Sequence, residues 1–143
     1  MYQLNNVLLE GVVATTPEVV ATNSVTKSRL VKFVLANDRF YRDLTGAPKQ
    51  ETLFIPVQCW GDLGEQCLTT MKKGMQTRCV GRLMLCRWQS KQGQQRSTIE
   101  VVCNHLEVRV PFGSLDRGGG VEILEDRKKE AETLSETVVL YEF

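Results

Sequence analysis

The sequence has few of the side chains from which metal centres and disulfide frameworks are built. It contains a single histidine, His105, and an odd number of cysteines, none of them in a C-x-x-C pair. Zinc sites need closely spaced ligands, and the disulfide frameworks of small secreted proteins need an even number of cysteines. We therefore expect no metal, no cofactor, and reduced cysteines that act as small buried hydrophobes. The cysteines are Cys59, Cys67, Cys79, Cys86 and Cys103.

Long apolar segments and catalytic motifs are also missing. No apolar run approaches the roughly 20 residues that span a bilayer, and residues 1–11 lack the basic start and apolar stretch of a secretory signal. We accordingly expect a cytoplasmic protein. The chain has no nucleophile elbow, phosphate-binding loop, metal triad or paired-carboxylate motif. We expect that it is not an enzyme, and the alternative to exclude is a thiol-based catalyst that uses a cysteine with His105.

The charges are unevenly distributed along the chain. Residues 1–112 carry 14 Lys and Arg against 9 Asp and Glu, and residues 113–143 carry 4 against 8, which together give the net charge of +1. The length of 143 residues suits one domain, and GSLDRGGG after Phe112 is typical of a flexible linker. We expect one domain over residues 1–112 and a linker with an acidic C-terminal tail over residues 113–143. A basic body with an acidic tail favours nucleic-acid binding, although solvated charged tails are common.

The first half of the chain contains three segments with the apolar content or alternation of β-strands. We predict strands over residues 4–13, 29–37 and 53–60, and a connection with at most a short extended piece between the first two. In the third segment the odd-numbered residues form an aliphatic face, which leaves Phe54 and Trp60 on the reverse. Pro56 has no amide donor, so this strand should lie at an edge or break its pairing there.

The apolar spacing then becomes helical, and a hairpin follows. Asp62 is a suitable N-cap for the helix and Gly74 is placed to end it. Residues 72–103 predict a long β-hairpin, whose second strand runs to about residue 110, with Gly93 in its loop. Alternation places Leu83 and Leu85 on one face of the hairpin, and we expect this face to be buried. On the second strand this face holds Ile99, Val101 and Cys103. The other face of the first strand, expected to be exposed, holds Arg82, Met84, Cys86 and Trp88.

Three strands, a helix and two further strands indicate an all-β protein. Five strands are too few for a large sandwich and sufficient for a small closed barrel. We predict a five-stranded OB-fold barrel with one helix between strands 3 and 4, plus a flexible acidic C-terminal tail. Domains of this fold bind oligonucleotides or oligosaccharides on an open face and its loops.

Five aromatic residues stand where packing in the core explains them poorly. Phe40 and Tyr41 lie in what we expect to be a basic loop, Phe54 and Trp60 lie opposite an aliphatic face, and Trp88 lies between basic residues. Flat side chains beside cations suit stacking on a planar, negatively charged ligand. Alternatives are that Trp88 is partly buried at an edge and that Phe54 and Trp60 fill a subunit interface. Phe40, rather than Tyr41, is a further candidate for contact with the ligand.

The chain resembles the bacterial single-stranded DNA-binding protein family. The matching stretches are NNVLLEGVVATTPEV, KFVLANDRFYRD, QCWGDLGEQ, KKGMQTRCVGRL and RWQSKQGQQRSTIEVV, which cover most of residues 5–103. The last two are the most specific. The resemblance implies an OB-fold homotetramer that wraps and protects single-stranded DNA in replication, repair and recombination. It also implies a cytoplasmic, nucleoid-associated protein that recruits partner proteins through an acidic C-terminal tip.

The resemblance also implies a set of DNA-binding residues. The stacking aromatics of the family fall at Tyr41, Phe54, Trp60 and Trp88. Cations for the phosphates are expected at matched positions and near them, although Lys73 also suits the negative end of the preceding helix. These cations are Arg42, Lys49, Lys73, Arg82, Arg87, Lys91 and Arg96.

The chain departs from the family pattern in two respects, its positive charges and its tail tip. Pro56, Asp62, Met84 and Cys86 stand where relatives often carry positive charge, which predicts fewer phosphate contacts. The tail tip lacks the run of aspartates followed by Ile-Pro-Phe, although the last residue is still phenylalanine. We expect this tip to bind partner proteins, and an inert solubilising tail is the alternative. The residues of the tip are Leu140, Tyr141, Glu142 and Phe143.

We therefore expect sequence-independent binding of single-stranded DNA by stacking on aromatics and contacts from Lys and Arg to phosphates. The alternative is an OB-fold module that binds RNA or serves as a primosome accessory factor.

Overall fold

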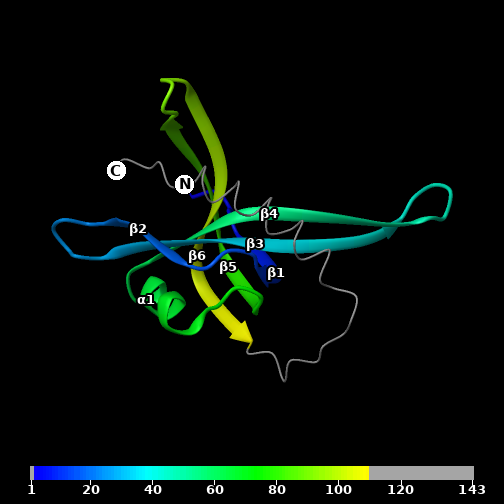
Figure 1. Ribbon diagram of the computed structural model, residues 1–143, viewed down its shortest axis with the longest axis horizontal. Helices are drawn as coiled ribbons and strands as arrows, with labels where there is room; N and C mark the ends of the chain where they lie inside the picture. Colours follow the sequence, from blue (N-terminus) through cyan, green and yellow to red (C-terminus); the bar gives the residue numbers. More distant parts are fainter. Residues whose placement is uncertain (1, 110–143) are drawn as a thin grey trace.

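Six strands and one helix follow one another in the computed structural model, which describes residues 2–109 (Figure 1). The elements are β1 (Val7–Val13), β2 (Glu18–Thr22), β3 (Arg29–Arg42), β4 (Pro48–Trp60), α1 (Gly61–Thr70), β5 (Gln76–Gln89) and β6 (Gln95–Arg109).

The strands form one curled sheet that closes on itself. Their order is β1-β5-β6-β4-β3-β2, and an additional pairing of β1 with β3 completes a barrel of β1, β3, β4, β5 and β6. The helix lies between β4 and β5, which are the third and fourth barrel strands, so the predicted five-stranded barrel with one helix is confirmed. The short strand β2 pairs only with β3 and falls in the segment that we expected to be mainly a connection.

Close backbone approach at two glycines allows the barrel to close. A Cβ atom on Gly11 would lie 2.2 Å from the carbonyl oxygen of Ala36, where β1 crosses onto β3. A Cβ atom on Gly81 would lie 2.2 Å from the carbonyl oxygen of Val102 on β6. Only glycine fits at such contacts, because any side chain would push the strands apart.

Pro56 lies next to a short ladder of the barrel. β4 pairs with β3 along its whole length, but its parallel pairing with β6 is restricted to Val57 with Val101 and Gln58 with Val102. The short ladder begins immediately after the proline, as its missing amide donor predicts.

The helix begins and ends earlier than its sequence predicts. Trp60 occupies the N-cap position, its side chain makes no capping hydrogen bond, and Asp62 lies in the first turn. The carboxylate of Asp62 therefore favours the helix through its position near the positive end of the helix dipole. Asp62 is not the N-cap, and the helix ends at Thr70, before Gly74.

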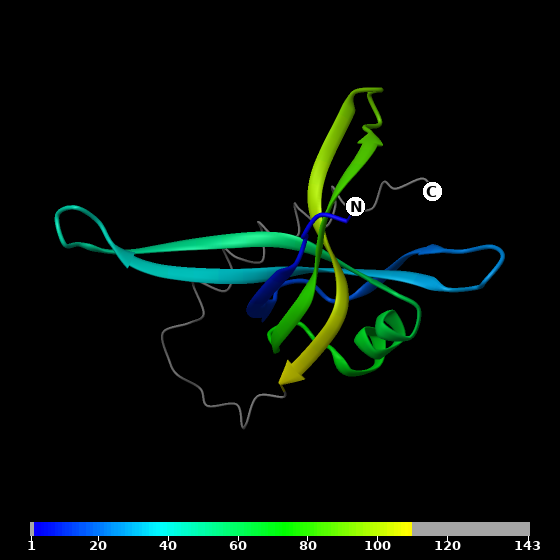
Figure 2. The ribbon, with the colours of Figure 1, turned by 180° about the vertical axis from the view of Figure 1, so that it is seen from behind.

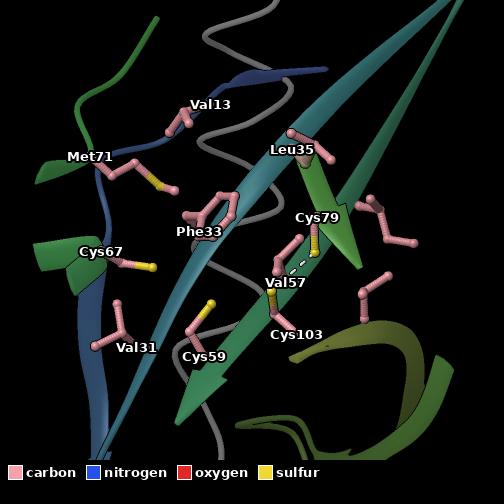
Figure 3. Close-up of a cluster of buried hydrophobic side chains, with 12 residues drawn as sticks. Val13, Val31, Phe33, Leu35, Val57, Cys59, Cys67, Met71, Cys79 and Cys103 are labelled. Atoms are coloured by element: carbon pink, nitrogen blue, oxygen red, sulfur yellow. Dashed lines mark hydrogen bonds between the residues drawn. The ribbon is translucent and has the colours of Figure 1, made fainter. Parts of the chain in front are cut away.

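The hydrophobic core fills the barrel between the strands and α1 (Figure 3). The odd-numbered residues of β3 and β4 supply one wall of it, as predicted from their alternation. Cys67 and Met71 enter the core from α1 and the residue after it. The wall residues are Val31, Phe33, Leu35, Ile55, Val57 and Cys59.

Two hairpins extend well beyond the barrel. Past Ala36, strand β3 pairs only with β4, and past Gly81, strand β5 pairs only with β6. We call residues 37–53 the β3–β4 arm and residues 83–99 the β5–β6 arm. Figures 1 and 2 show the two arms leaving the barrel in different directions, with α1 on the side away from both tips.

The expectation that Leu83, Leu85 and Ile99 face the core is wrong. Their side chains are 41%, 52% and 58% exposed, whereas Val101 and Cys103 on the same side of the hairpin are buried. Alternation correctly grouped these residues on one face. The arm carries that face past the rim of the barrel, where no core remains to cover it.

A β-bulge and a side-chain amide shape the base of the β5–β6 arm. Val80 pairs with His105 and Gly81 pairs with Cys103, so Asn104 is an extra residue that bends β6. Asn5 donates from Nδ2 to the carbonyl of Leu83 at 2.9 Å and accepts from the amide of Leu83 at 2.9 Å. The side chain of Asn5 thus replaces one strand residue next to β5.

The predicted tail over residues 113–143, including the tip Leu140, Tyr141, Glu142 and Phe143, lies outside the described residues. Within residues 2–109, no helix has the length and apolar character needed to cross a membrane.

Candidate nucleic-acid interface

Strand register divides the side chains of β3 and β4 into two faces. The pairing runs without a shift from Leu30 opposite Trp60 to Arg42 opposite Pro48, so even-numbered residues of both strands point to one side. Side-chain contacts agree with this division. Thr52 donates to Asp38 at 2.7 Å on the even-numbered side, and Arg39 lies 3.3 Å from Glu51 on the odd-numbered side.

The same face continues onto β6 and β5 through a set of polar contacts. Gln58 donates to Glu100 at 2.9 Å and to the sulfur of Cys86 at 3.2 Å, and Lys32 lies 2.9 Å from Glu100. Because these residues come from four neighbouring strands, one surface spans the barrel and both arms. We call this surface, built from even-numbered residues, the even face.

Aromatic side chains are accessible on the β3–β4 part of the even face. Phe40 is 73% exposed near the end of the arm, and Trp60 is 36% exposed at the end of β4. Phe54 lies between them along the strands and is half-buried. The face therefore presents three rings, each with surface available to a planar ligand.

Tyr41, which the family resemblance named, lies on the opposite face. It pairs with Lys49 on the odd-numbered side, and the guanidinium of Arg39 lies 4.9 Å from the centre of its ring. That contact has the geometry of a cation–π interaction. Of the two neighbours that sequence reasoning left open, Phe40 is the one that shares a face with Phe54 and Trp60.

The expectation that Trp88 is exposed is wrong. Its side chain is 9% exposed, and its indole N–H has no hydrogen-bond partner among the described residues. Trp88 follows Cys86 on the even face, where Cys86 is held against Gln58. The even-numbered side of β5 is thus packed into a buried layer at this point, whereas alternation alone placed it in solvent.

The predicted cations fall into three groups. Arg42, Arg82 and Arg96 are exposed and lie on the even face with the aromatics. Lys49 and Arg87 are exposed on the opposite side of the two arms. Lys73 and Lys91 lie in turns outside the strands. The structure therefore brings three of the seven cations to the even face.

Sequence reasoning missed the buried polar group at the centre of the even face. Lys32 and Glu100 are 4% and 0% exposed, and Gln58 is 2% exposed. Burial lowers the pKa of Lys32, and its hydrogen bond to Glu100 opposes that shift. The sequence showed that Lys32 shares a strand face with Val34 and Ala36. It could not show that Gln58 and Glu100 are its neighbours, because these residues lie on two other strands whose register is not known from the sequence.

Within residues 2–109, no group of three or more His, Cys, Asp or Glu side chains is placed to hold a metal ion.

Comparisons with known proteins agree with this architecture. A five-stranded barrel with one helix after its third strand is the OB-fold, whose members bind oligonucleotides or oligosaccharides. The chain belongs to the family described as "Single-strand binding protein family", whose family model matches residues 4–109.

Relatives and solved structures are similar along most of the chain. It is 32% identical to Single-stranded DNA-binding protein 1 of Chlorobaculum tepidum over 118 residues, or 82% of this chain and 70% of that protein. It is 34% identical to the Single-stranded DNA-binding protein of Clostridium tetani over 105 residues, or 73% and 69% of the two chains. The solved structure "Plasmodium falciparum SSB complex with ssDNA" has a similar fold, with a TM-score of 0.70 at 20% identity over 77% of this chain and 98% of that one.

Proposed function

We propose that this protein binds single-stranded DNA without sequence preference, as a binding protein rather than an enzyme. The observation that carries the proposal is the even face, where Phe40, Phe54 and Trp60 share one surface with exposed arginines. Membership of the single-strand binding protein family supports it.

Binding is driven by stacking and by neutralisation of phosphates. An unpaired base exposes its π-face, and each base stacked on an aromatic ring contributes about 1–3 kcal/mol, whichever base it is. Arg42, Arg82 and Arg96 then contact the backbone, and their release of counterions makes the affinity fall as salt rises. The rings lie along β3 and β4, so the bound DNA should follow these two β-strands across the barrel.

Titration with oligo(dT) at low salt tests the proposal through tryptophan fluorescence. The protein has two tryptophans, of which Trp60 is accessible and Trp88 is buried. We expect quenching of the Trp60 emission, measured in a Trp88→Phe variant that leaves Trp60 as the only emitter. Duplex DNA of equal length is the control, because its bases are already stacked. Unchanged emission and no binding to oligo(dT) would contradict the proposal.

An OB-fold module that binds RNA or assists a primosome is the alternative. Stacking does not distinguish DNA from RNA, since both present the same π-faces. Competition between oligo(dT) and oligo(U) for the same protein separates the two functions. Preference for oligo(dT) supports the proposal, and preference for oligo(U) favours the alternative.

We also propose that the protein is a homotetramer. A closed tetramer with two-fold symmetry needs two different self-complementary contacts. One candidate is the apolar patch of Leu83, Leu85 and Ile99 on the β5–β6 arm, and the other is β1, which pairs with β5 on one side and meets β3 only at Val12 and Val13. Exposed apolar patches and open strand edges are surfaces that proteins commonly cover by association.

We propose roles in replication, repair and recombination, with a nucleoid-associated location, as the DNA-binding function implies. The acidic segment over residues 113–143 is proposed to recruit partner proteins through its apolar tip. Deletion of residues 113–143 should leave the affinity for oligo(dT) unchanged or slightly increased, because an acidic segment competes with DNA for cations. A marked loss of affinity would place this segment in the binding site.

A further inference from the structure

Four of the five cysteines converge inside the barrel, although they are far apart in the sequence. They come from four elements: Cys59 from β4, Cys67 from α1, Cys79 from β5 and Cys103 from β6. Figure 3 shows their sulfur atoms in the core beside Val57 and Phe33. Cys86 lies apart from them, on the even face beside Gln58.

The sulfur atoms of one pair in this group lie within hydrogen-bond distance of each other. The sulfur atoms of Cys79 and Cys103 are 3.3 Å apart, as the dashed line in Figure 3 marks. Cys103 is paired with Gly81, two residues along β5 from Cys79. The bulge at Asn104 bends β6 there, and Gly81 has no side chain to separate the two thiols.

The two thiols differ in chemical character. The thiol of Cys79 donates to the sulfur of Cys103, whose own thiol donates to the carbonyl oxygen of His105 at 3.2 Å. The neighbouring thiols of Cys59 and Cys79 lower the pKa of Cys103. The pKa of Cys79 is raised, first because its thiol donates to Cys103 and second because the side chain is buried. Cys103 is also the member of the pair with some exposure, 7% against 0% for Cys79. Cys103 is therefore the sulfur that a small oxidant meets first.

We infer that Cys79 and Cys103 are an oxidation site, at which hydrogen peroxide converts two thiols into a disulfide across β5 and β6.

The reaction balances with hydrogen peroxide as the two-electron oxidant. The sulfur of Cys103 attacks one peroxide oxygen, the O–O bond breaks, and water leaves to give a sulfenic acid on Cys103. The sulfur of Cys79 then attacks the sulfur of Cys103, the S–O bond breaks, and a second water leaves with the thiol proton. Two thiols and one peroxide thus give one disulfide and two waters. A thiol reductant reverses the reaction.

The bond would close a covalent loop around the β5–β6 arm. Residues 80–102 lie between the two cysteines, so the whole arm and its turn become part of the ring. The pair points into the barrel, away from the even face, so oxidation should leave the affinity for single-stranded DNA unchanged. The expected effect is on the barrel, because a cross-link restricts the unfolded chain.

Trypsin separates the cysteines in a way that identifies the pair directly. Cleavage after Lys and Arg places Cys79 in peptide 79–82, Cys86 in peptide 83–87 and Cys103 in peptide 97–109. Cys59 and Cys67 remain together in peptide 50–72. The full chain is treated with hydrogen peroxide, free thiols are alkylated in denaturant, and the unreduced digest is analysed by mass spectrometry. We expect peptides 79–82 and 97–109 joined with the loss of two hydrogen atoms, and their separation by dithiothreitol.

Cysteine variants distinguish a Cys79–Cys103 disulfide from one that Cys103 forms with another core cysteine. Cys79→Ser should abolish the joined peptides, and Cys67→Ser should retain them. Joining of peptide 50–72 to peptide 97–109 as the main product would overturn the inference in favour of Cys59 or Cys67. Alkylation of both Cys79 and Cys103 after peroxide treatment would overturn it as well. Peptide mapping of the unmodified chain tests the inference even if a variant does not fold. The mapping involves no DNA, so a negative result would not bear on the proposed function.

Discussion

Phe40 and Tyr41 are neighbours in the chain, yet they lie on opposite faces of the β3–β4 arm. Phe40 shares the even face with Phe54, whereas the ring of Tyr41 lies under Arg39 on the other side. We predict that Phe40→Ala weakens binding of oligo(dT) roughly 5- to 150-fold, as loss of one stacked base implies. Tyr41→Ala is the matched control and should change the affinity much less. An equal or larger effect of Tyr41→Ala in the same titration would show that the DNA binds the odd-numbered side of the β3–β4 arm.

Glu100 is a second residue whose environment decides the effect of its substitution. In Glu100→Gln, the buried ammonium of Lys32 loses its counter-charge, and such losses cost about 3–5 kcal/mol of stability. Glu51→Gln removes a partner from the exposed Arg39–Glu51 pair and should cost about 1 kcal/mol or less. Urea unfolding of the two variants measures the difference. Equal midpoints would mean that Lys32 finds another neighbour or becomes neutral without cost.

At the scale of elements, the turn of the β3–β4 arm depends on the ionised form of Asp43. Thr45 donates to the Asp43 carboxylate from its hydroxyl at 2.6 Å and its amide at 2.9 Å, and the Ala47 amide donates at 3.0 Å. These bonds lower the pKa of Asp43, the Thr45 hydroxyl contributing most. Because the folded pKa is lower than the unfolded one, the stabilisation is complete above the unfolded pKa and is lost as pH falls through the folded pKa.

Amide chemical shifts of Thr45 and Ala47, followed by NMR on acidification, measure this transition. We expect both amides to titrate together below the ordinary pKa range of aspartate. In Asp43→Ala the transition should disappear. A midpoint at or above the ordinary pKa of aspartate would show that the turn does not stabilise the ionised form of Asp43.

Apolar content and alternation in the sequence were sufficient to locate the barrel strands and to predict core residues of β3 and β4, such as Phe33 and Val57. They did not predict that these two strands extend over residues 38–42 and 48–52, which we expected to form a loop. Alternation also grouped Leu85 with Val101 correctly. Alternation does not report how far a hairpin runs past the barrel, so it could not predict that Leu85 is exposed and Trp88 is buried. The pairing of Lys32 with Glu100 was likewise unpredictable, since it depends on the order of β3, β4 and β6 in the sheet.

At the scale of the whole molecule, the apolar patch of the β5–β6 arm is the proposed contact between subunits. Leu85→Glu places a charge among Leu83 and Ile99, and burial of an unpaired charge in an apolar contact is strongly unfavourable. We predict that this variant forms smaller assemblies than the unmodified chain, as measured by light scattering. Leu44→Glu is the control, because Leu44 is 108% exposed in the turn of the other arm. An unchanged mass for Leu85→Glu would remove the patch from the interface.

The amide of Asn5, which takes the place of a strand residue beside Leu83, holds this contact only as long as it stays an amide. Slow hydrolysis of that amide to a carboxylate would remove the hydrogen that the Leu83 carbonyl accepts and set two oxygens against each other. Stored samples would then gradually release the segment before β1 while the rest of the barrel stays folded.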